Sequence, residues 1–313
     1  MEMKKQYISD LNAGNRMDSN IIPLKPGKNA AITPGSHGSK ALNLLKISNH
    51  FLVSPGCAVG SSYFQRAYKS LKKIRPRDVA KDPSVLNILE PEFIHGVVTA
   101  LEEAKISSGP LIVRSSYDLE DGKDSSFSGQ FISIRDVDFS PANAVDLKKA
   151  ILAVWLSAFD RTLLHYYQKH KIAAKGGMGL IIQKQLSPDW FGVTFSLDPA
   201  TFSKKHMVME YKKKGFDAHL EGKNNANICW LEKAKKDRAG YSIAKERIFD
   251  HEEILPDADL LRIAQWVKKI EKIYGFPVDV EWGLQRARSN GKKVDHWYVF
   301  QVREITGKSH PSA

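Results

Sequence analysis

Two short segments near the carboxyl end alternate strictly between apolar and polar residues, and this alternation constrains the fold more than any other feature. Residues 278–282 read Val-Asp-Val-Glu-Trp, and residues 298–303 read Tyr-Val-Phe-Gln-Val-Arg. Successive side chains of a strand point to opposite faces, so each segment predicts a β-strand with one polar face. The polar linker 285–295, with Asn290-Gly291 at its turn, predicts that the two strands form an antiparallel hairpin.

The polar faces of this hairpin carry residues suited to a metal and to phosphate. Asp279 and Glu281 share one face, and Gln301 and Arg303 lie together on the second strand, opposite Phe300. Magnesium takes hard oxygen ligands, usually one or two from the protein, and arginine donates bidentate hydrogen bonds to phosphate. From the pattern alone, an ordinary solvent-facing strand is the simpler interpretation.

The spacing of apolar residues elsewhere predicts an α+β protein with antiparallel sheet in its second half. The helix expected over 257–274 begins after Pro256 and ends at Gly275, as helix start and stop signals require. Other helices are expected over 39–50 and 61–74 and within 141–172. Strands are expected over 111–114, 131–134, 180–186, 191–197, 207–211, 228–231, 241–249, 278–284 and 296–305.

Length and composition indicate a soluble protein with one large or two closely packed lobes. The chain has 313 residues, 42% of them hydrophobic and 26% charged. The amino terminus lacks the apolar region of a signal peptide, and the apolar run 150–159 is too short to span a bilayer. The two cysteines, Cys57 and Cys229, have no metal-ligand spacing. We therefore expect a cytoplasmic protein without a disulfide scaffold or zinc site.

The formal charge of +12 suits an anionic ligand but does not identify one. The basic residues occur in small separate clusters, each of which fits a solvated loop or turn. Neither an aromatic platform nor a recognition-helix motif accompanies them. Nucleic-acid binding is therefore the least favoured function, although the charge alone is compatible with it.

A second candidate site follows the apolar strand 111–114. Arg114 leaves this strand into a loop rich in serine and glycine that runs to Gln130, and such a loop can approach phosphate oxygens closely. Lys40 lies in the first turn of a helix after a glycine turn, where phosphate is attracted. Neither GxGxxG after a strand nor a GxxxxGK[ST] loop is present. Each feature by itself fits an ordinary surface loop or an exposed lysine.

The order of these motifs closely resembles a known family over residues 35–306. The series begins with two short motifs, Gly38-x-Lys40-x-x-Asn43-Leu44 and Val53-x-Pro55-Gly56. Three more specific blocks follow: Val113-Arg114-Ser115-Ser116, Glu120-Asp121 and Ser126-Phe127-Ser128-Gly129-Gln130. The series ends with Gly192-Val193-x-Phe195-Ser196-x-Asp198-Pro199, Asp279-x-Glu281-Trp282 and Gln301-x-Arg303-x-x-Thr306. This series resembles the amino-terminal ATP-binding domain of phosphoenolpyruvate synthase, pyruvate phosphate dikinase, the rifampin phosphotransferases and the glucan water dikinases.

The resemblance implies an ATP-grasp-like domain with two lobes and assigns roles to individual residues. Lys40 and Arg114 would hold the phosphates, and Arg303 would contact the transferring phosphoryl group. Glu281 and Gln301 would ligate Mg2+, and Asp279 would line the nucleotide site. The strand 180–186 would give backbone contacts to adenine, with the hinge formed by Gln183, Lys184 and Gln185.

By the same resemblance, residues 1–34 form an N-terminal arm and 35–110 the first part of the ATP-binding domain. Residues 111–306 form the ATP-grasp core with the phosphate loop and closing hairpin, and 307–313 form a C-terminal tail. Two departures are visible. Gly215-Phe216-Asp217-Ala218 replaces the family's Gly-Leu-Gly-Glu, so a second acidic contact near the metal is missing. Tyr117 and Asp118 stand where the family has smaller residues or threonine.

The expected function is that of a stand-alone, Mg-ATP-dependent kinase or dikinase domain. It would pass a phosphoryl group to a histidine on a separate partner protein or to a small-molecule acceptor, since the sequence shows no carrier-histidine motif. The alternative from another class is a non-catalytic ATP-binding module that regulates or scaffolds a partner. The missing glutamate favours this alternative, and the retained Lys40, Arg114, Glu281, Gln301 and Arg303 oppose it.

Overall fold

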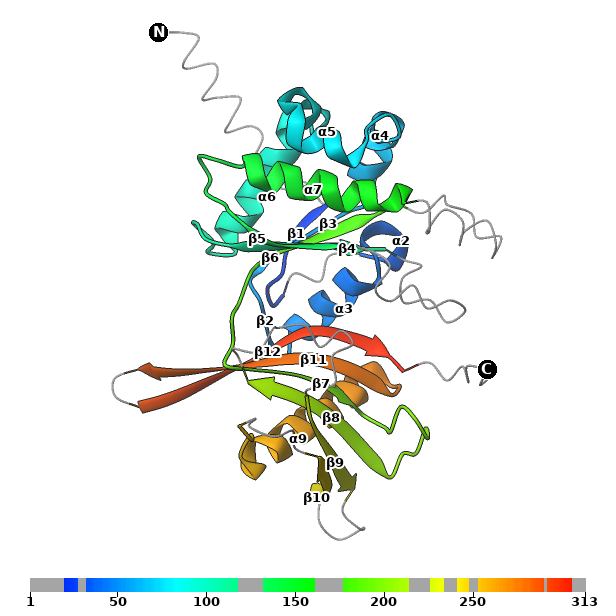
Figure 1. The fold of residues 1–313 in the computed structure, drawn as a ribbon, viewed down its shortest axis with the longest axis vertical. Coiled ribbons are helices and arrows are strands. Elements are labelled where there is room, and N and C mark those ends of the chain that lie inside the picture. The colour runs from blue at the N-terminus through cyan, green and yellow to red at the C-terminus, as the bar shows by residue number, and fades with distance from the viewer. Residues whose placement is uncertain are drawn as a thin grey trace. The chain divides into compact units, whose positions relative to one another are not determined.

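The computed structural model describes residues 20–27, 32–117, 132–160, 177–213, 226–233, 241–247, 253–289 and 292–305 (Figure 1). The chain forms two compact units. Unit 1 comprises Met1–Leu42 and Pro55–Gln185, and unit 2 comprises Asn43–Ser54 and Leu186–Ala313. Helix α3 (Ser39–Ser48) contributes residues to both units. The predicted boundaries at residues 35, 111 and 306 follow motifs rather than contacts and stay predictions.

Unit 1 contains a sheet in which every neighbouring pair of strands is antiparallel. The order is β1-β3-β6-β4-β5, with β1 at Ile21–Pro23, β3 at Gly56–Val59, β6 at Gly179–Lys184, β4 at Leu111–Ser116 and β5 at Ser133–Val137. Strand β1 lies within residues 1–34, the predicted N-terminal arm. No strand was predicted there, because Ile21–Pro23 is too short to show periodicity and is stabilised by pairing with β3.

Helices α6 and α7 lie over one face of the unit 1 sheet (Figure 1). The core beneath them is aromatic: Phe93 of α6 stacks on Trp155 of α7 at 5.5 Å between ring centroids, and Tyr63 contacts Phe93 at 4.4 Å. The helical elements of this unit are α2 (Pro34–His37), α4 (Ser62–Leu71), α5 (Pro76–Lys81), η1 (Pro83–Ile88), α6 (Pro91–Glu103), α7 (Val145–Leu156) and η2 (Ser157–Phe159).

Unit 2 contains a larger, mostly antiparallel sheet in the order β10-β9-β8-β7-β11-β12-β2. Only the β12–β2 pair is parallel within the described residues. The strands are β10 (Tyr241–Arg247), β9 (Asn227–Lys233), β8 (His206–Lys213), β7 (Trp190–Phe195), β11 (Val278–Ser289), β12 (Lys292–Glu304) and β2 (Leu52–Val53). The α+β class with largely antiparallel sheets is therefore confirmed.

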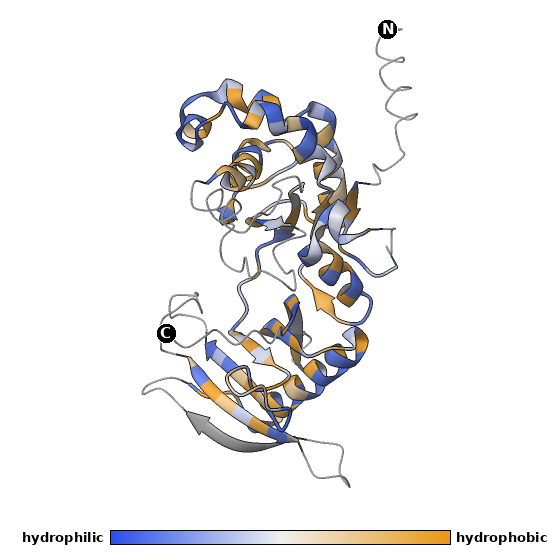
Figure 2. Cartoon of the chain, turned by 90° about the vertical axis from the view of Figure 1, so that its right-hand side faces the viewer, coloured by the Kyte–Doolittle hydropathy of each residue, from blue (hydrophilic) through white to orange (hydrophobic). Residues whose placement is uncertain are grey.

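Helix α9 (Asp257–Tyr274) packs on one face of the unit 2 sheet. Asp257 and Asp259 lie in its first turn, and Gly275 ends it in the left-handed conformation with φ 79°. Buried residues alternate with more exposed ones along β7 and much of β11 and β12, and in β11 and β12 hydrophobic and hydrophilic residues alternate accordingly (Figure 2). Trp282 is central to this core: its indole Nε1 donates to Thr194 Oγ1 at 2.9 Å, and both side chains are buried.

Most predicted elements are present, and α9 has the predicted bounds. The prediction of a polar linker over 285–295 is wrong, because β11 and β12 continue pairing to Ser289 and Lys292 and this segment is mainly strand. The second half of the chain contains the predicted antiparallel sheet, and the sheet of unit 1 is antiparallel as well. Helices α5 and α6 were not expected, although Pro91 and the spacing of Phe93, Val97 and Leu101 are typical of a helix.

Several predicted features lie outside the described residues. They are most of the arm (1–19 and 28–31), the serine-rich loop 118–131, the end of the predicted helix 141–172, the segment 214–225 that contains Gly215, the turn 290–291 and the tail from Thr306. Among the helices that are described, none has the length and apolar character needed to cross a bilayer.

Candidate nucleotide and metal site

The β11–β12 hairpin pairs the predicted polar residues directly across from one another. Asp279 is opposite Arg303, and Glu281 is opposite Gln301. Arg303 Nη2 lies 2.8 Å from Asp279 Oδ2 and 3.4 Å from Glu281 Oε1. This pairing brings a carboxylate pair, an amide and a guanidinium onto one face, on the side of the sheet away from the buried Val280 and Trp282 side chains.

These side chains are partly shielded from solvent. The exposed fraction of the side chain is 13% for Asp279, 25% for Arg303 and 32% for Glu281, and Gln301 is buried. Partial burial strengthens electrostatic interactions, since the surrounding protein screens charge less than water does. The ion pairs of Arg303 with Asp279 and Glu281 are therefore stronger than the same pairs would be on an open strand.

A β-bulge changes the predicted placement of Phe300. The register shifts between Glu281 and Trp282, so that Gln301 pairs with Glu281 and Val299 with Trp282. Phe300 is the extra residue, and its ring lies over Gly283: a Cβ at position 283 would be 2.6 Å from Phe300 Cε2. The prediction that Phe300 faces away from Gln301 and Arg303 is wrong, because the bulge shifts the alternation after Phe300 and puts Gln301 and Arg303 on the face where its ring lies.

Glu210 is a further acidic residue on this face that the sequence reasoning missed. Glu281 pairs with Val193 of β7, and Val193 pairs with Glu210 of β8. Strand spacing puts Glu210 about 10 Å from Glu281 along the sheet. It is half-buried, and burial raises the pKa of its carboxyl. In the sequence, Glu210 is the one carboxylate within a strand whose neighbouring residues Met207, Met209 and Tyr211 are buried. An acidic residue in such an apolar strand is the signal that could have revealed it.

Asn43 fixes the strand that carries Gln301 and Arg303. Its Nδ2 donates to the carbonyl of Val302 at 3.0 Å, and its own carbonyl accepts from Tyr274 Oη at 2.8 Å. Lys46 Nζ lies 4.3 Å from the centre of the Tyr274 ring. Burial raises the pKa of Tyr274, which keeps its hydroxyl a donor. Asn43 therefore joins α3 to β12 and α9 within unit 2.

Unit 1 holds the other predicted phosphate-binding residues on neighbouring elements. Lys40 lies in the first turn of α3, and Arg114 lies on β4. The helix and the strand are joined because the backbone N–H of Ala41 donates to Ser116 Oγ at 3.0 Å. Gly38 has φ 81°, and a Cβ there would lie 2.2 Å from the carbonyl oxygen of Ser116. Only glycine permits this close approach.

The predicted hinge residues end strand β6 in unit 1. Gln183 is buried in the sheet between Ile112 and Gly56. The backbone N–H groups of Lys184 and Gln185 donate to the carbonyls of Pro55 and Pro110. The Gln185 side chain makes two 2.7 Å hydrogen bonds with Asp136. These contacts hold the end of β6, and both backbone donors are engaged within the protein.

The chain matches a protein-family model over most of its length. Residues 35–217 and 221–313 match the family described as "Pyruvate phosphate dikinase, AMP/ATP-binding domain". The chain belongs to this family.

Its relatives in the pyruvate phosphate dikinase family are longer proteins. An "Uncharacterized phosphotransferase YvkC" of Bacillus subtilis is 23% identical over 288 residues, which is 86% of this chain and 33% of the relative. The "Rifampicin phosphotransferase" of the same organism is 25% identical over 70% of this chain and 26% of its own length. The "Phosphoenolpyruvate synthase" of Pyrococcus furiosus is 24% identical over 62% and 26%. The chain thus spans about a third or less of each.

Among solved structures, an L-amino acid ligase from Bacillus licheniformis overlaps 63% of this chain and 34% of its own. Its TM-score is 0.30 at 16% identity, which is too low to carry an argument about the fold. Membership of the pyruvate phosphate dikinase family confirms the resemblance that the motifs indicated. The roles of the individual site residues stay predictions.

The donor set on the hairpin fits magnesium rather than zinc. Across the described ranges, no group of three or more His, Cys, Asp or Glu side chains is arranged to hold a metal. Both cysteines are buried and form no disulfide, and burial raises the pKa of Cys57 to about 12, which disfavours a thiolate ligand. One carboxylate and one amide oxygen, from Glu281 and Gln301, are the kind and number that magnesium takes from a protein.

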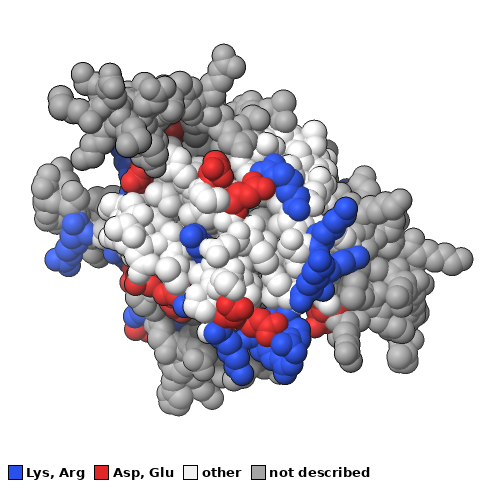
Figure 3. Space-filling model, turned by 90° about the horizontal axis from the view of Figure 1, so that it is seen from above, with Lys and Arg blue, Asp and Glu red and all other residues white. Residues whose placement is uncertain are grey.

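Charged side chains of both signs lie on the face of the molecule drawn in Figure 3. On the face drawn in Figure 3, lysine and arginine side chains lie in several separate groups, and acidic side chains lie near several of them. Arg66 is paired with Glu90, and Arg75 with Asp78, in unit 1. A continuous basic stripe, which backbone recognition of nucleic acid uses, is not seen on this face.

Proposed function

We propose that the chain binds Mg-ATP and transfers a phosphoryl group from it to a histidine on a separate partner protein or to a small-molecule acceptor. Family membership and the names of the relatives support ATP-dependent phosphoryl transfer. The observation that carries the proposal is the cross-strand set of Asp279, Glu281, Gln301 and Arg303. It combines oxygen ligands for a divalent cation with a guanidinium for phosphate.

Glu281 and Gln301 would hold magnesium. Their opposed positions allow an oxygen from each strand to reach one ion, and a cation there would supply charge neutralisation to the phosphates. Glu210, on the same face, would stabilise the cation from farther away in place of the family glutamate that the sequence lacks.

The basic residues would position and neutralise the phosphates. Phosphoryl transfer depends mainly on positioning and on neutralising charge at the transferred group. Arg303 would contact that group, and Lys40 and Arg114 of unit 1 would hold the remaining phosphates. The acceptor nucleophile forms its bond to phosphorus as the bond to the leaving phosphate oxygen breaks, so the protein itself needs no covalent step.

Nucleotide binding would require Arg303 to exchange partners. Arg303 is paired with Asp279 and Glu281 in the structure. When Arg303 turns to bind phosphate, Glu281 becomes available to a cation. Binding of the phosphate and binding of the cation should therefore favour each other. We therefore expect magnesium and ATP to bind cooperatively, with a coupling in the usual range of about 1–3 kcal/mol.

The proposal is tested by calorimetric titration of ATP with and without magnesium. Glu281→Gln and Arg114→Ala should each weaken Mg-ATP binding by about tenfold or more, through loss of a charged contact. The control for Glu281→Gln is Glu232→Gln, at an exposed glutamate of unit 2, and the control for Arg114→Ala is Arg77→Ala, at an exposed arginine of unit 1. Both control variants should bind Mg-ATP as the wild type does. A folded wild-type protein that does not bind Mg-ATP would refute the nucleotide assignment.

Transfer is tested separately with ATP labelled at the β- or γ-phosphate. Incubation with candidate acceptor proteins should move one label to an acid-labile phosphohistidine or to a small molecule, and Arg303→Met should abolish the transfer. Magnesium-dependent binding with no transfer to any acceptor would support the non-catalytic ATP-binding module instead.

A further inference from the structure

Unit 2 contains a pocket of about 770 Å³ on the α9 side of its sheet. Its walls come from the chain after α3, from α9 and from β12, and its main lining residues are Phe51, Leu52, Trp266, Lys269, Lys272 and Trp297. A volume of this size lies in the range of small-molecule sites. No residue proposed for nucleotide binding lines it.

Three aromatic rings form a continuous wall of this pocket. Phe51 meets Trp266 edge-on at 5.4 Å between centroids, and Trp266 meets Trp297 edge-on at 5.5 Å. Trp297 is buried and contacts Trp282 of the core at 6.0 Å. The wall is therefore anchored in the core and held rigid. Rigid aromatic walls favour a flat, apolar ligand, because little side-chain entropy is lost on binding.

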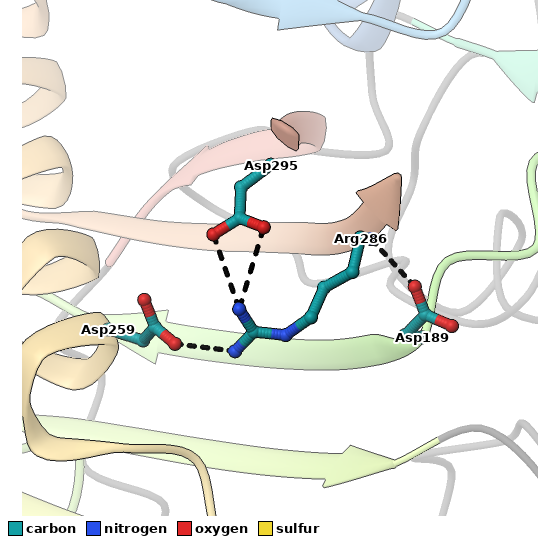
Figure 4. A network of polar contacts seen from close by, with 4 residues as sticks. All are labelled: Asp189, Asp259, Arg286 and Asp295. Carbon is teal, nitrogen blue, oxygen red and sulfur yellow. Dashed lines mark hydrogen bonds and ion pairs between the residues drawn. The ribbon is translucent and has the colours of Figure 1, made fainter. Parts of the chain in front are cut away.

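The charges at the rim favour an anion. Lys269 and Lys272 are exposed and lie near each other on α9, and His50 is also exposed. The one carboxylate in the lining, Asp295, is bound by Arg286, with Oδ2 3.2 Å from Nη1 (Figure 4). Arg286 is held in turn by Asp259 at 2.6 Å, and its backbone N–H donates to Asp189. Arg286 divides its single positive charge between Asp295 and Asp259, so it offsets Asp295 only in part. The lining itself carries two lysines against this one carboxylate, which leaves a net positive charge for a ligand.

A solvated helix face would account for the two lysines but not for the apolar surface beside them. Leu52, on the edge strand β2, lines the pocket and is 52% exposed. Trp266 is half-buried next to it in the lining. Exposed apolar surface around a hollow is a feature of binding sites.

The pocket lies on the opposite side of the sheet from the candidate metal residues. Trp282 and Trp297 point toward α9. Glu281 is the neighbour of Trp282 on β11 and faces the other way, and the bulge at Phe300 puts Gln301 on the same face as Glu281. A ligand in the pocket and a nucleotide on the polar face would therefore not compete for the same contacts.

We propose that this pocket binds a small organic anion with a flat aromatic body, whose carboxylate, sulfonate or phosphate group is held by Lys269 and Lys272. The aromatic wall would hold the body of the ligand and the lysines its charge. The site is additional to the proposed nucleotide site and does not depend on it.

Naphthalene-2-sulfonate is a suitable probe, titrated calorimetrically into the full chain. Its size predicts a dissociation constant of about 0.1–1 mM. The double variant Lys269→Met, Lys272→Met should weaken binding about tenfold, whereas Lys268→Met, an exposed lysine of the same helix outside the pocket, should not change it. The neutral analogue 2-naphthylmethanol should bind more weakly and be insensitive to the lysine variants.

Two further measurements separate this site from others. Trp266→Ala should weaken both naphthyl compounds, and saturating Mg-ATP should leave the affinity of the sulfonate unchanged. The proposal is overturned if the sulfonate does not bind the folded wild-type protein, if the lysine double variant binds it as tightly, or if Mg-ATP displaces it. Melting curves of each variant establish that the protein is folded.

Discussion

Arg303 and Asp279 face each other across the β11–β12 hairpin, with Nη2 of the arginine 2.8 Å from Oδ2 of the aspartate. The same nitrogen lies 3.4 Å from Glu281 Oε1. One guanidinium thus binds the proposed metal ligand and its neighbour at once. The strength of magnesium binding should depend on whether Arg303 is present.

Arg303→Met should therefore raise the affinity for a divalent cation in the absence of ATP while abolishing phosphoryl transfer. Without the guanidinium, two adjacent carboxylates on a partly shielded face lack their counter-charge, and a cation replaces it. We expect about a tenfold gain in Mn2+ affinity, measured by electron paramagnetic resonance. Arg288→Met, an exposed position farther along β11, is the control. An unchanged Mn2+ affinity in Arg303→Met would show that the carboxylates do not bind the metal.

Gly38→Ala should destabilise the protein far more than Gly27→Ala. Both glycines have a positive φ, 81° and 77°, so both substitutions introduce backbone strain of about 1 kcal/mol. A Cβ at position 38 would also collide with the Ser116 backbone, whereas nothing lies within 4 Å of one at position 27. The clash should add at least about 2 kcal/mol, measured by urea unfolding. Equal losses in the two variants would mean that α3 moves away from β4 at no cost.

The sequence predicts those parts of the site that depend on local periodicity. Alternation within each strand places Asp279 with Glu281 and Gln301 with Arg303. That the two pairs share one face could not be predicted. It depends on the bulge, because the register near the turn, continued without it, would put Phe300 opposite Glu281.

Other features depend on contacts between distant parts of the chain. Asn43 and β2 belong to unit 2 although they precede most of unit 1, and their partners Val302 and Tyr298 lie about 250 residues later. Glu210 reaches the polar face only through the strand order β8-β7-β11. Helix α6, by contrast, has its own signals at Pro91, Phe93 and Val97, and could have been predicted from them.

Asn43→Ala should lower the free energy of unfolding by about 1–2 kcal/mol, because the carbonyl of Val302 loses its donor. The same change should reduce phosphoryl transfer more than ATP affinity, since it loosens the strand that carries Arg303. Asn49→Ala, near the end of α3, removes longer hydrogen bonds to Leu45 and Lys46 and should have a smaller effect. If Asn43→Ala changed stability alone, Asn43 would have no positioning role.

Cys57 should make the stability of the protein depend on pH above about 9. Burial raises the pKa of its thiol from 9.0 to about 12, so the native state keeps the proton that the unfolded state loses. The stabilising effect is complete below pH 9 and is lost as the pH rises toward 12. The variant Cys57→Ala has no thiol and should lack this pH dependence. Between pH 8 and pH 10 the free energy of unfolding of the wild type should therefore fall by about 1 kcal/mol more than that of the variant.

The burial of Cys57 can also be tested by chemical labelling. Iodoacetamide at pH 8.5 should label Cys57 only after urea is added, because a buried thiol that stays protonated is a poor nucleophile. Rapid labelling of the native protein at Cys57 would show that β3 opens readily to solvent.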